Sequence, residues 1–204
     1  MTHILIPLVG SLFFTAAAPG QGPLALVRSA DAEVDKVLSA GGATVEKLAE
    51  RADDFIDFVE LARRALGSDW DALSKKQQQE FSSTMKGVLR ASYAQKVLTD
   101  GRGSAKVQYG DERVEGNEAT VATTIRIKDD TLPVVYRLFR AGAAARWKIY
   151  DVITDEVSLV STYNDQFRQV IAKKGFEGLL KSLKARKAQL EAMAKQRSSP
   201  AAVE

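Results

Sequence analysis

One short segment, WKIYDVITDEVSLVSTYNDQF at positions 147–167, combines acids and serines that could do chemistry. Four acids and two serines lie within it: Asp151, Asp155, Glu156, Asp165, Ser158 and Ser161. A serine beside a lysine can become a nucleophile, and two carboxylates such as Asp151 and Asp155 can serve as general acid and general base. Neither pair forms a recognisable catalytic motif. The segment alone fits a catalytic corner, a gate or an ordinary junction between a strand and a helix.

The composition removes most other routes to catalysis. The chain has no cysteine, which excludes disulfides, thiolate nucleophiles and cysteine-ligated metals. Its only histidine is His3, so a Ser-His-Asp triad, a histidine-bound zinc or an imidazole proton shuttle has no residue to use. We therefore expect no enzymatic activity, no metal and no cofactor. The 29 basic residues barely exceed the 26 acidic ones, and this small excess does not indicate a nucleic-acid partner.

The N-terminus has the features of an export signal. Residues 4–18, ILIPLVGSLFFTAAA, form a continuous apolar run that is too short for a typical transmembrane helix. Small residues at Thr15 and Ala17 suit signal-peptidase cleavage before Ala18. The usual Lys or Arg ahead of the run is missing, which leaves an N-terminal anchor or a different start codon as the alternative.

The predicted organisation has three parts. Residues 1–17 are expected to be a signal peptide, residues 18–197 a single domain, and residues 198–204 a disordered tail. A mature chain of this length can bury a substantial core, and it is expected to be soluble once the signal is removed.

The first half of the domain has the apolar spacing of helices. The sequence predicts one helix over residues 24–40, ended by the two glycines that follow, and a second over residues 55–66, ended by Gly67. Ser74 and Gln77 match a capping box and open a long third helix. An apolar stripe on that helix is more typical of a core than of a binding surface: Phe81, Met85, Val88 and Leu89.

A strand-rich stretch follows. Four segments have the alternation and the residue types of strands: residues 105–110, 119–128, 132–139 and 145–153. Short polar turns join them, which predicts an antiparallel meander. One face of such a sheet needs cover, and only the flanking helices can supply it. The predicted fold class is therefore α+β, with a four-stranded sheet packed against helices.

Helices return after the last predicted strand. We expect Asp155 and Glu156 at the start of a helix, where carboxylates suit the unpaired amide groups, which explains these acids without catalysis. Gly175 is expected to end that helix, and a final helix begins at Phe176. The outer face of the final helix is basic, and it is either simply solvated or docks to an acidic partner or anionic lipid.

Two long segments resemble a known family. They are FVELARRALGSDWDALSKKQQQEFSSTMKGVLRASYAQKV and RWKIYDVITDEVSLVSTYNDQFRQVIAKKGFEGLLKSLKAR. Both resemble the MlaC family of periplasmic phospholipid-binding proteins, also called the toluene-tolerance auxiliary family, and PVVYRL at residues 133–138 fits as well. Several residues of the second segment fall in register: Trp147, Tyr150, Asp151, Val157, Ser158, Leu159, Tyr163, Phe167 and Leu179. Glu156 departs from the family, which usually has glycine there, and Asn164 stands where arginine is common.

The resemblance implies a function. Such proteins are the binding component of an ABC-type lipid transport system that maintains outer-membrane asymmetry. They hold the acyl chains of a phospholipid in an apolar cavity between sheet and helices. They shuttle between an inner-membrane ABC complex and an outer-membrane lipoprotein complex. The protein is accordingly expected to be a periplasmic monomer. A related carrier of hopanoid or sterol-like lipids remains an alternative, as does a membrane-surface module that uses the basic final helix.

The expected cavity wall combines apolar faces of the sheet and of the helices. Its predicted members are Phe81, Met85, Val121, Ile125, Val134, Tyr136, Leu138, Val157, Val160 and Phe167. Residues 150–167 are expected to form a gate at the rim, where Ser158 and Ser161 allow close approach and are not nucleophiles. Glu156 in place of glycine is expected to stiffen this corner.

Overall fold

A computed structural model describes residues 21–41, 43–100, 105–127 and 129–198. The predicted signal peptide lies outside the described residues, and so does the predicted tail apart from Ser198, which is helical. Within the described ranges no helix is both long enough and apolar enough to cross a bilayer.

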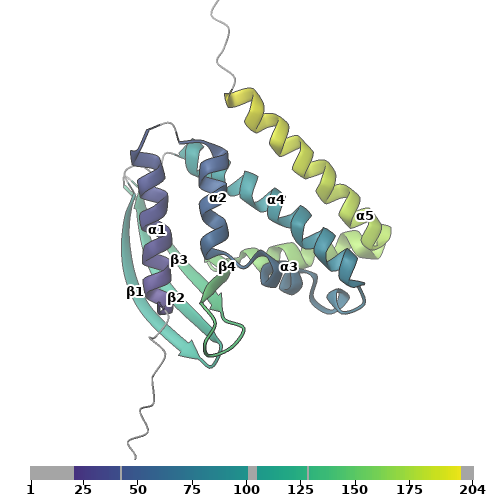
Figure 1. Ribbon diagram of the computed structural model, residues 1–204, viewed down its shortest axis with the longest axis horizontal. Coiled ribbons are helices and arrows are strands. Elements are labelled where there is room, and N and C mark those ends of the chain that lie inside the picture. The colour runs from purple at the N-terminus through teal and green to yellow at the C-terminus, as the bar shows by residue number, and fades with distance from the viewer. Residues whose placement is uncertain (1–20, 42, 101–104, 128, 199–204) are drawn as a thin grey trace, which may run out of the picture.

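The fold is α+β, as predicted, with a meander sheet on one side and a group of helices on the other (Figure 1). One sheet contains the strands in chain order, all antiparallel: β1 (Lys106–Glu115), β2 (Glu118–Ile127), β3 (Asp130–Phe139), β4 (Lys148–Thr154) and β5 (Val157–Ser158). The prediction of four strands in this order is confirmed, but it missed β5. A strand of two residues carries too little pattern to be recognised from sequence.

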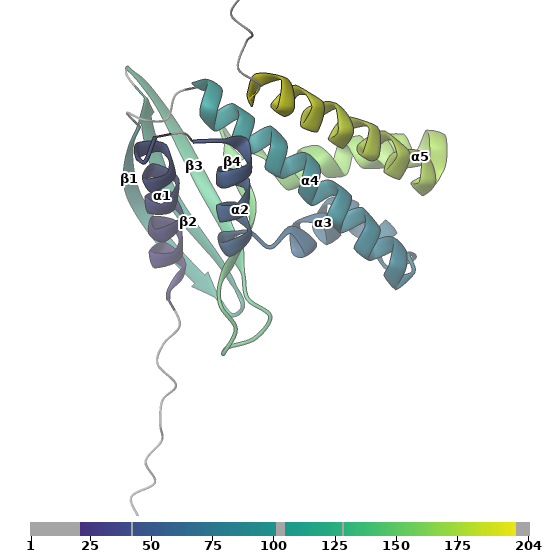
Figure 2. The same ribbon diagram turned by 45° about the horizontal axis from the view of Figure 1, so that its top comes forward.

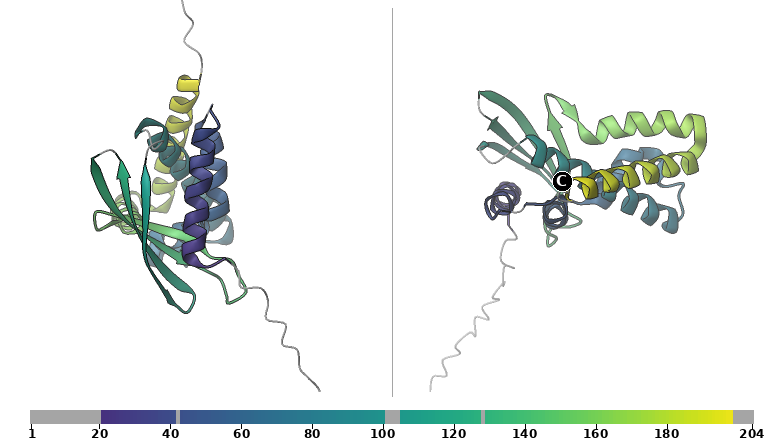
Figure 3. Two further views of the ribbon diagram at one scale, coloured as in Figure 1. Left: turned by 90° about the vertical axis from the view of Figure 1, so that its left-hand side faces the viewer. Right: turned by 90° about the horizontal axis from the view of Figure 1, so that it is seen from above.

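The described helices are α1 (Pro23–Ser39), α2 (Val45–Phe55), α3 (Phe58–Leu66), a 3-10 turn η1 (Gly67–Trp70), α4 (Lys75–Asp100) and α5 (Leu159–Ser198). Helices α1 and α2 lie side by side against one face of the sheet (Figures 1 and 3). Helices α3, α4 and α5 pack together beyond β4, so the sheet and this helical group lie next to each other (Figure 2).

The register of the sheet places the predicted apolar faces together. Val121 pairs with Tyr136 and Ile125 with Leu132, so the inward residues of β2 and β3 share the face covered by α1 and α2. Part of that face forms a packed core in which Leu26 of α1 contacts the sheet. The remainder is available to line a cavity.

The predicted helix over residues 55–66 begins later, at Phe58, because Phe55 is the last residue of α2, a helix that the prediction missed. Ile56 separates the two helices and forms a parallel bridge with Ile149 of β4. Asp57 then caps α3, because its Oδ1 accepts hydrogen bonds from the amides of Val59 (3.1 Å) and Glu60 (2.9 Å). An aspartate inside a helical pattern was the available sign of a new N-terminus.

The helical group has its own core. The Ser74 capping box is confirmed, since the Ser74 amide donates to Gln77 Oε1 (3.0 Å) and the Gln77 amide donates to Ser74 Oγ (3.3 Å). Phe81 of α4 meets Phe167 of α5 edge to face, with ring centroids 5.6 Å apart. The predicted helix break at Gly175 is confirmed, since this residue has φ of 67° inside α5. The two arms of α5 on either side of it fold back on each other (Figure 3).

The predicted position of Asp155 and Glu156 at a helix start is wrong. Thr154 pairs with Val157 across a two-residue turn in which Asp155 has φ of 48° and Glu156 has φ of 65°. Positive φ at both central residues defines the tight hairpin turn that favours Asn-Gly or Asp-Gly. The family's glycine at position 156 therefore fits the turn, whereas Glu156 adopts it under strain.

Glu156→Gly is expected to raise the free energy of unfolding by about 1 kcal/mol, because glycine adopts this conformation without the steric cost of a Cβ atom. Urea denaturation checks the change. Glu156→Ala is the matched control, since it removes the carboxylate but keeps the Cβ, and it should leave the midpoint nearly unchanged. A gain from alanine equal to that from glycine would show that charge, and not backbone strain, is the cause.

Candidate functional site

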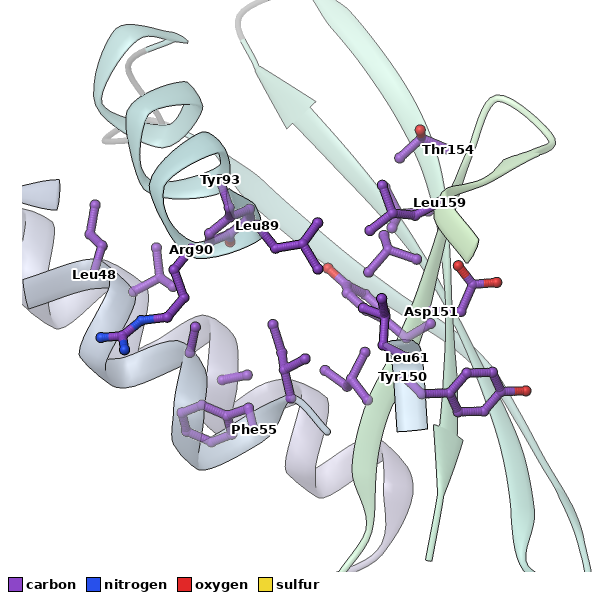
Figure 4. Close-up of a pocket in the computed structure, with 18 of the residues that line it drawn as sticks. Leu48, Phe55, Leu61, Leu89, Arg90, Tyr93, Tyr150, Asp151, Thr154 and Leu159 are labelled. Atoms are coloured by element: carbon purple, nitrogen blue, oxygen red, sulfur yellow. The ribbon is translucent and has the colours of Figure 1, made fainter. Parts of the chain in front are cut away.

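An apolar cavity of about 290 Å³ lies between the sheet and helices α1, α2 and α4 (Figure 4). Its helical wall includes Val34, Leu48, Ala52, Phe55 and Leu89, and its strand wall includes Ile125, Ile127, Leu132, Val134, Tyr136 and Val152. The volume is near the lower end of the range for small-molecule sites, roughly 300–1,000 Å³. Such a lining suits an apolar ligand, because it offers few hydrogen-bonding groups and a large area for hydrophobic contact.

The structure brings three of the ten predicted wall residues to this cavity, namely Ile125, Val134 and Tyr136. The other seven lie elsewhere among the described residues. Val121 and Leu138 share the inward face of the sheet, but α1 covers them, so they are fully buried core. Phe81, Met85 and Phe167 belong to the core of the helical group, with Val160 packed partly against it, and Val157 is 59% exposed on β5.

Most of the helical wall was missed because the contribution of α2 was not recognised. Leu48, Ala52 and Phe55 have the spacing of one helical face, which was the signal available in the sequence. Leu89, which was assigned to a core face, is buried in the core of the helical group and also borders the cavity. Tyr93, one turn further along α4, lines it as well, since this part of α4 packs against α2 (Figure 4).

Two cations join this otherwise apolar wall, Arg51 of α2 and Arg90 of α4. Asp53 Oδ2 is 3.5 Å from Arg90 Nη1 and 2.7 Å from Lys86 Nζ. The ion pairs of Arg51 are long: its Nε lies 3.9 Å from Glu33 Oε2, and its Nη1 lies 4.0 Å from Asp54 Oδ2. Both cations of the site therefore lie on its helical side, whereas the one acid among its described lining residues, Asp151, lies on β4.

Asp151 of β4 lies on the side of the cavity opposite the two arginines and is only 1% exposed (Figure 4). Its Oδ2 accepts a hydrogen bond from Ser158 Oγ (2.7 Å) and its Oδ1 accepts one from the amide of Val160 (3.0 Å). Ser158 Oγ in turn accepts from the Ser161 amide (3.0 Å), so Ser158 caps the start of α5. Figure 4 shows the Asp151 carboxyl directed away from the cavity. The acid and the serine thus join β4 to β5 and α5, which gives them a structural role.

Ser158→Ala is expected to lower the free energy of unfolding by about 1–2 kcal/mol, since it removes the helix cap and leaves a buried carboxylate oxygen with one partner fewer. Ser161→Ala is the matched control, because Ser161 is exposed and only its amide takes part, and it should change stability by less than about 0.5 kcal/mol. Thermal or urea unfolding checks both. Equal losses would contradict the capping role.

An ionic cluster centred on Arg64 holds α3 against the sheet. Arg64 Nε donates to Glu60 (2.7 Å), its Nη2 donates to Glu118 (2.7 Å), and its guanidinium lies 3.8 Å from the centroid of the Tyr150 ring. Burial raises the pKa of the Tyr150 phenol, although the Arg64 charge opposes the rise. Burial also acts to raise the pKa of Glu60, but hydrogen bonds from Arg63 and Arg64 outweigh it, and the net pKa is lowered. The cluster thus ties α3 to β2 and β4, two strands that also border the cavity.

A second hollow of about 320 Å³ lies between α3 and α4. Most of its lining residues are polar or charged, namely Lys75, Gln78, Gln79, Ser82, Ser83 and Lys86, but the surface they present to the hollow is largely apolar. The first cavity has the more extensive apolar surface and is bordered by strands as well as helices, so it is the better site for acyl chains.

The fold and the cavity define a class of protein: an α+β binding protein with an apolar cavity between a meander sheet and helices. In the described part of the chain, no three His, Cys, Asp or Glu side chains come together in a way that could hold a metal ion. Residues 31–185 match the family described as MlaC protein, and the chain belongs to this family.

Two relatives support the assignment. The Intermembrane phospholipid transport system binding protein MlaC of Haemophilus influenzae (strain ATCC 51907 / DSM 11121 / KW20 / Rd) is 22% identical over 133 residues. That match covers 63% of this chain and 62% of the relative, so it spans less than two thirds of the relative's length. A solved structure from Ralstonia solanacearum, a phospholipid-binding protein in complex with a phospholipid, is similar with a TM-score of 0.73 and 26% identity. The similarity covers 85% of this chain and 99% of the Ralstonia solanacearum chain.

Proposed function

We propose that this protein is a phospholipid carrier that holds acyl chains in the cavity between the sheet and helices α1, α2 and α4. The observation that carries the proposal is the cavity itself, whose wall is apolar apart from a few polar side chains. The similar Ralstonia solanacearum structure, which contains a phospholipid, supports the choice of ligand.

Energetics explain why such a protein must be a carrier with partners. Burying a methylene is worth ~0.8 kcal/mol, so two acyl chains of about 15 methylenes each would lose roughly 24 kcal/mol on entering water. That exceeds the upper limit of non-covalent affinity, about 20 kcal/mol, and spontaneous release into water is negligible. The lipid must therefore leave the cavity while the protein is docked on an acceptor.

The proposal places the protein in the periplasm, between an inner-membrane ABC complex and an outer-membrane lipoprotein complex, as a monomer that has no catalytic step. Membership of the MlaC family supports these partners and this compartment. The bonding of Asp151 and Ser158 within the β4–β5–α5 junction supports a role without catalysis, since both groups stabilise the fold.

Native mass spectrometry of the mature protein, expressed with its export signal and purified without detergent, tests the proposal. The expected spectrum shows one phospholipid per chain, identified by fragmentation of the released lipid. A spectrum with only lipid-free protein, before and after incubation with phospholipid vesicles, would contradict the proposal. If the bound lipid is a hopanoid or a sterol-like lipid, the protein is a carrier of that lipid class and not a phospholipid carrier.

A further inference from the structure

Arg90 is the described cavity residue that has a buried side-chain nitrogen without a hydrogen-bond partner. Its Nε atom is buried and has no hydrogen-bond partner among the described residues, and its single ion pair, Nη1 to Asp53, is long at 3.5 Å. Figure 4 shows the side chain extending from α4 towards α2, on the side of the cavity opposite Asp151 and Thr154. A buried N–H group without an acceptor is rare in proteins and needs an explanation. Asp53 Oδ1 beside it is also buried and unpaired, so the Arg90–Asp53 pair is incomplete on both sides and leaves Arg90 with hydrogen-bonding capacity for a ligand.

The charges around Arg90 favour an anion. Lys86 and Arg90 share one carboxylate, that of Asp53, which leaves one positive charge of this cluster uncompensated. Arg51 adds a second guanidinium to the same cavity wall. Asp151 is the sole acid among the lining residues, and Figure 4 shows it on the other side with its carboxyl turned away. An anionic group at the helical wall would thus meet basic groups in a partly desolvated setting, where attraction is strong.

We propose that Arg90 binds the phosphate group of the lipid, and that Arg51 contributes a second cation from α2. This inference rests on the proposed function. The guanidinium donates through Nε and the Nη atoms in a planar fork that matches two phosphate oxygens. The lipid then lies with its phosphate between α2 and α4, and its acyl chains run towards Ile125 and Leu132 on the strands. Arg90 selects lipids that carry a phosphodiester, whatever headgroup follows it, over ring lipids without one.

A pair of ligands that differ only in the phosphate headgroup tests the inference. Dioctanoyl phosphatidylglycerol and dioctanoylglycerol have the same acyl chains, and displacement of a bound fluorescent lipid reports the affinity of each. The wild-type protein is expected to bind the phosphate-bearing lipid at least tenfold more tightly. Arg90→Gln should lower the affinity for dioctanoyl phosphatidylglycerol by about tenfold to a hundredfold. The affinity for dioctanoylglycerol should change by less than about twofold.

Lys86→Gln is the matched control. It removes a cation from the same Asp53 carboxylate, but Lys86 does not line the cavity, so the affinity for the phosphate-bearing lipid should fall by less than about threefold. Arg90→Lys keeps the charge without the fork and should give an intermediate loss. Thermal unfolding of each variant shows whether it folds. If Arg90→Gln does not fold, Arg90→Lys takes its place in the comparison of the two lipids.

The outcomes separate this inference from the proposed function. If the Arg90 substitutions lower the affinity for both lipids equally, the inference is overturned, because Arg90 then shapes the cavity without contacting phosphate. An effect of Lys86→Gln as large as that of Arg90→Gln would also overturn it, since general charge would be the cause. If the wild-type protein binds neither lipid, the proposed function itself fails.

Discussion

Replacing Ile125 with glutamate should lower the fraction of protein that carries a phospholipid at least tenfold, while the free energy of unfolding falls by only about 1–2 kcal/mol. Ile125 is half-buried on β2 and lines the cavity. In the lipid-free protein a carboxylate there can remain hydrated through the open cavity, whereas an acyl chain would strip its water away. The ratio of lipid to protein, measured by mass spectrometry, and urea denaturation give the two quantities.

Met85→Glu is the comparison for this experiment. Met85 is 1% exposed in the core of the helical group and does not line the cavity. A carboxylate at this position should lower stability by more than about 4 kcal/mol, and lipid binding is then lost only because the fold is lost. If Ile125→Glu unfolds the protein to the same extent, Ile125 is ordinary core. If Ile125→Glu keeps its lipid, the cavity is not the binding site.

Asp151→Ala should lower the free energy of unfolding by about 2–4 kcal/mol. The substitution leaves the Val160 amide and the Ser158 hydroxyl without their acceptor at a buried junction. It also removes the ion partner of Arg137, whose Nη1 lies 3.4 Å from Asp151 Oδ2. Urea denaturation measures the loss.

Arg137→Ala separates the two contributions to the effect of Asp151. The Arg137 side chain is 44% exposed, so its ion pair with Asp151 is partly screened by water and should contribute less than about 1 kcal/mol. A loss from Arg137→Ala as large as that from Asp151→Ala would show that the ion pair, and not the hydrogen bonds to α5, stabilises the junction. Normal stability of Asp151→Ala would contradict the structural role altogether.

The parts of the fold that were predictable are those with a strong repeating pattern. Strands β1 to β4 alternate apolar and polar residues or are rich in β-branched ones, and their short turns indicated the meander. The long helix α4 begins at a capping box, and the glycines at 41 and 175 mark helix ends in the sequence. These signals are local, so the sequence alone was enough to recognise them.

The errors occurred where two local signals compete or where tertiary contacts decide. Acids before an apolar run suit a helix start, but Asp155 and Glu156 instead occupy a tight turn, because pairing of β4 with β5 fixes the backbone there. At the α2–α3 break, Asp57 was a local sign of a new helix start, but the bridge between Ile56 and Ile149 that accompanies the break is a tertiary contact that periodicity does not reveal.

The cavity was only partly predictable for a related reason. Alternation correctly identified the inward face of β2 and β3, yet it does not say which part of that face a helix covers. Val121 and Leu138 are core because α1 packs over them, whereas Ile125 and Tyr136 line the cavity. Apolar character is the same in both places, and only the position of α1 and α2 distinguishes them.

The measurement that tests the central claim most directly is photocrosslinking of a bound phospholipid with a diazirine in the middle of one acyl chain, followed by peptide mapping. The cavity account predicts adducts on residues 48–56, 89–93 and 125–136, which come from α2, α4 and the strands that enclose the cavity. Adducts concentrated instead at Val59 and Ser82, in the hollow between α3 and α4, would contradict it and place the lipid in the wrong part of the fold for a carrier of this kind.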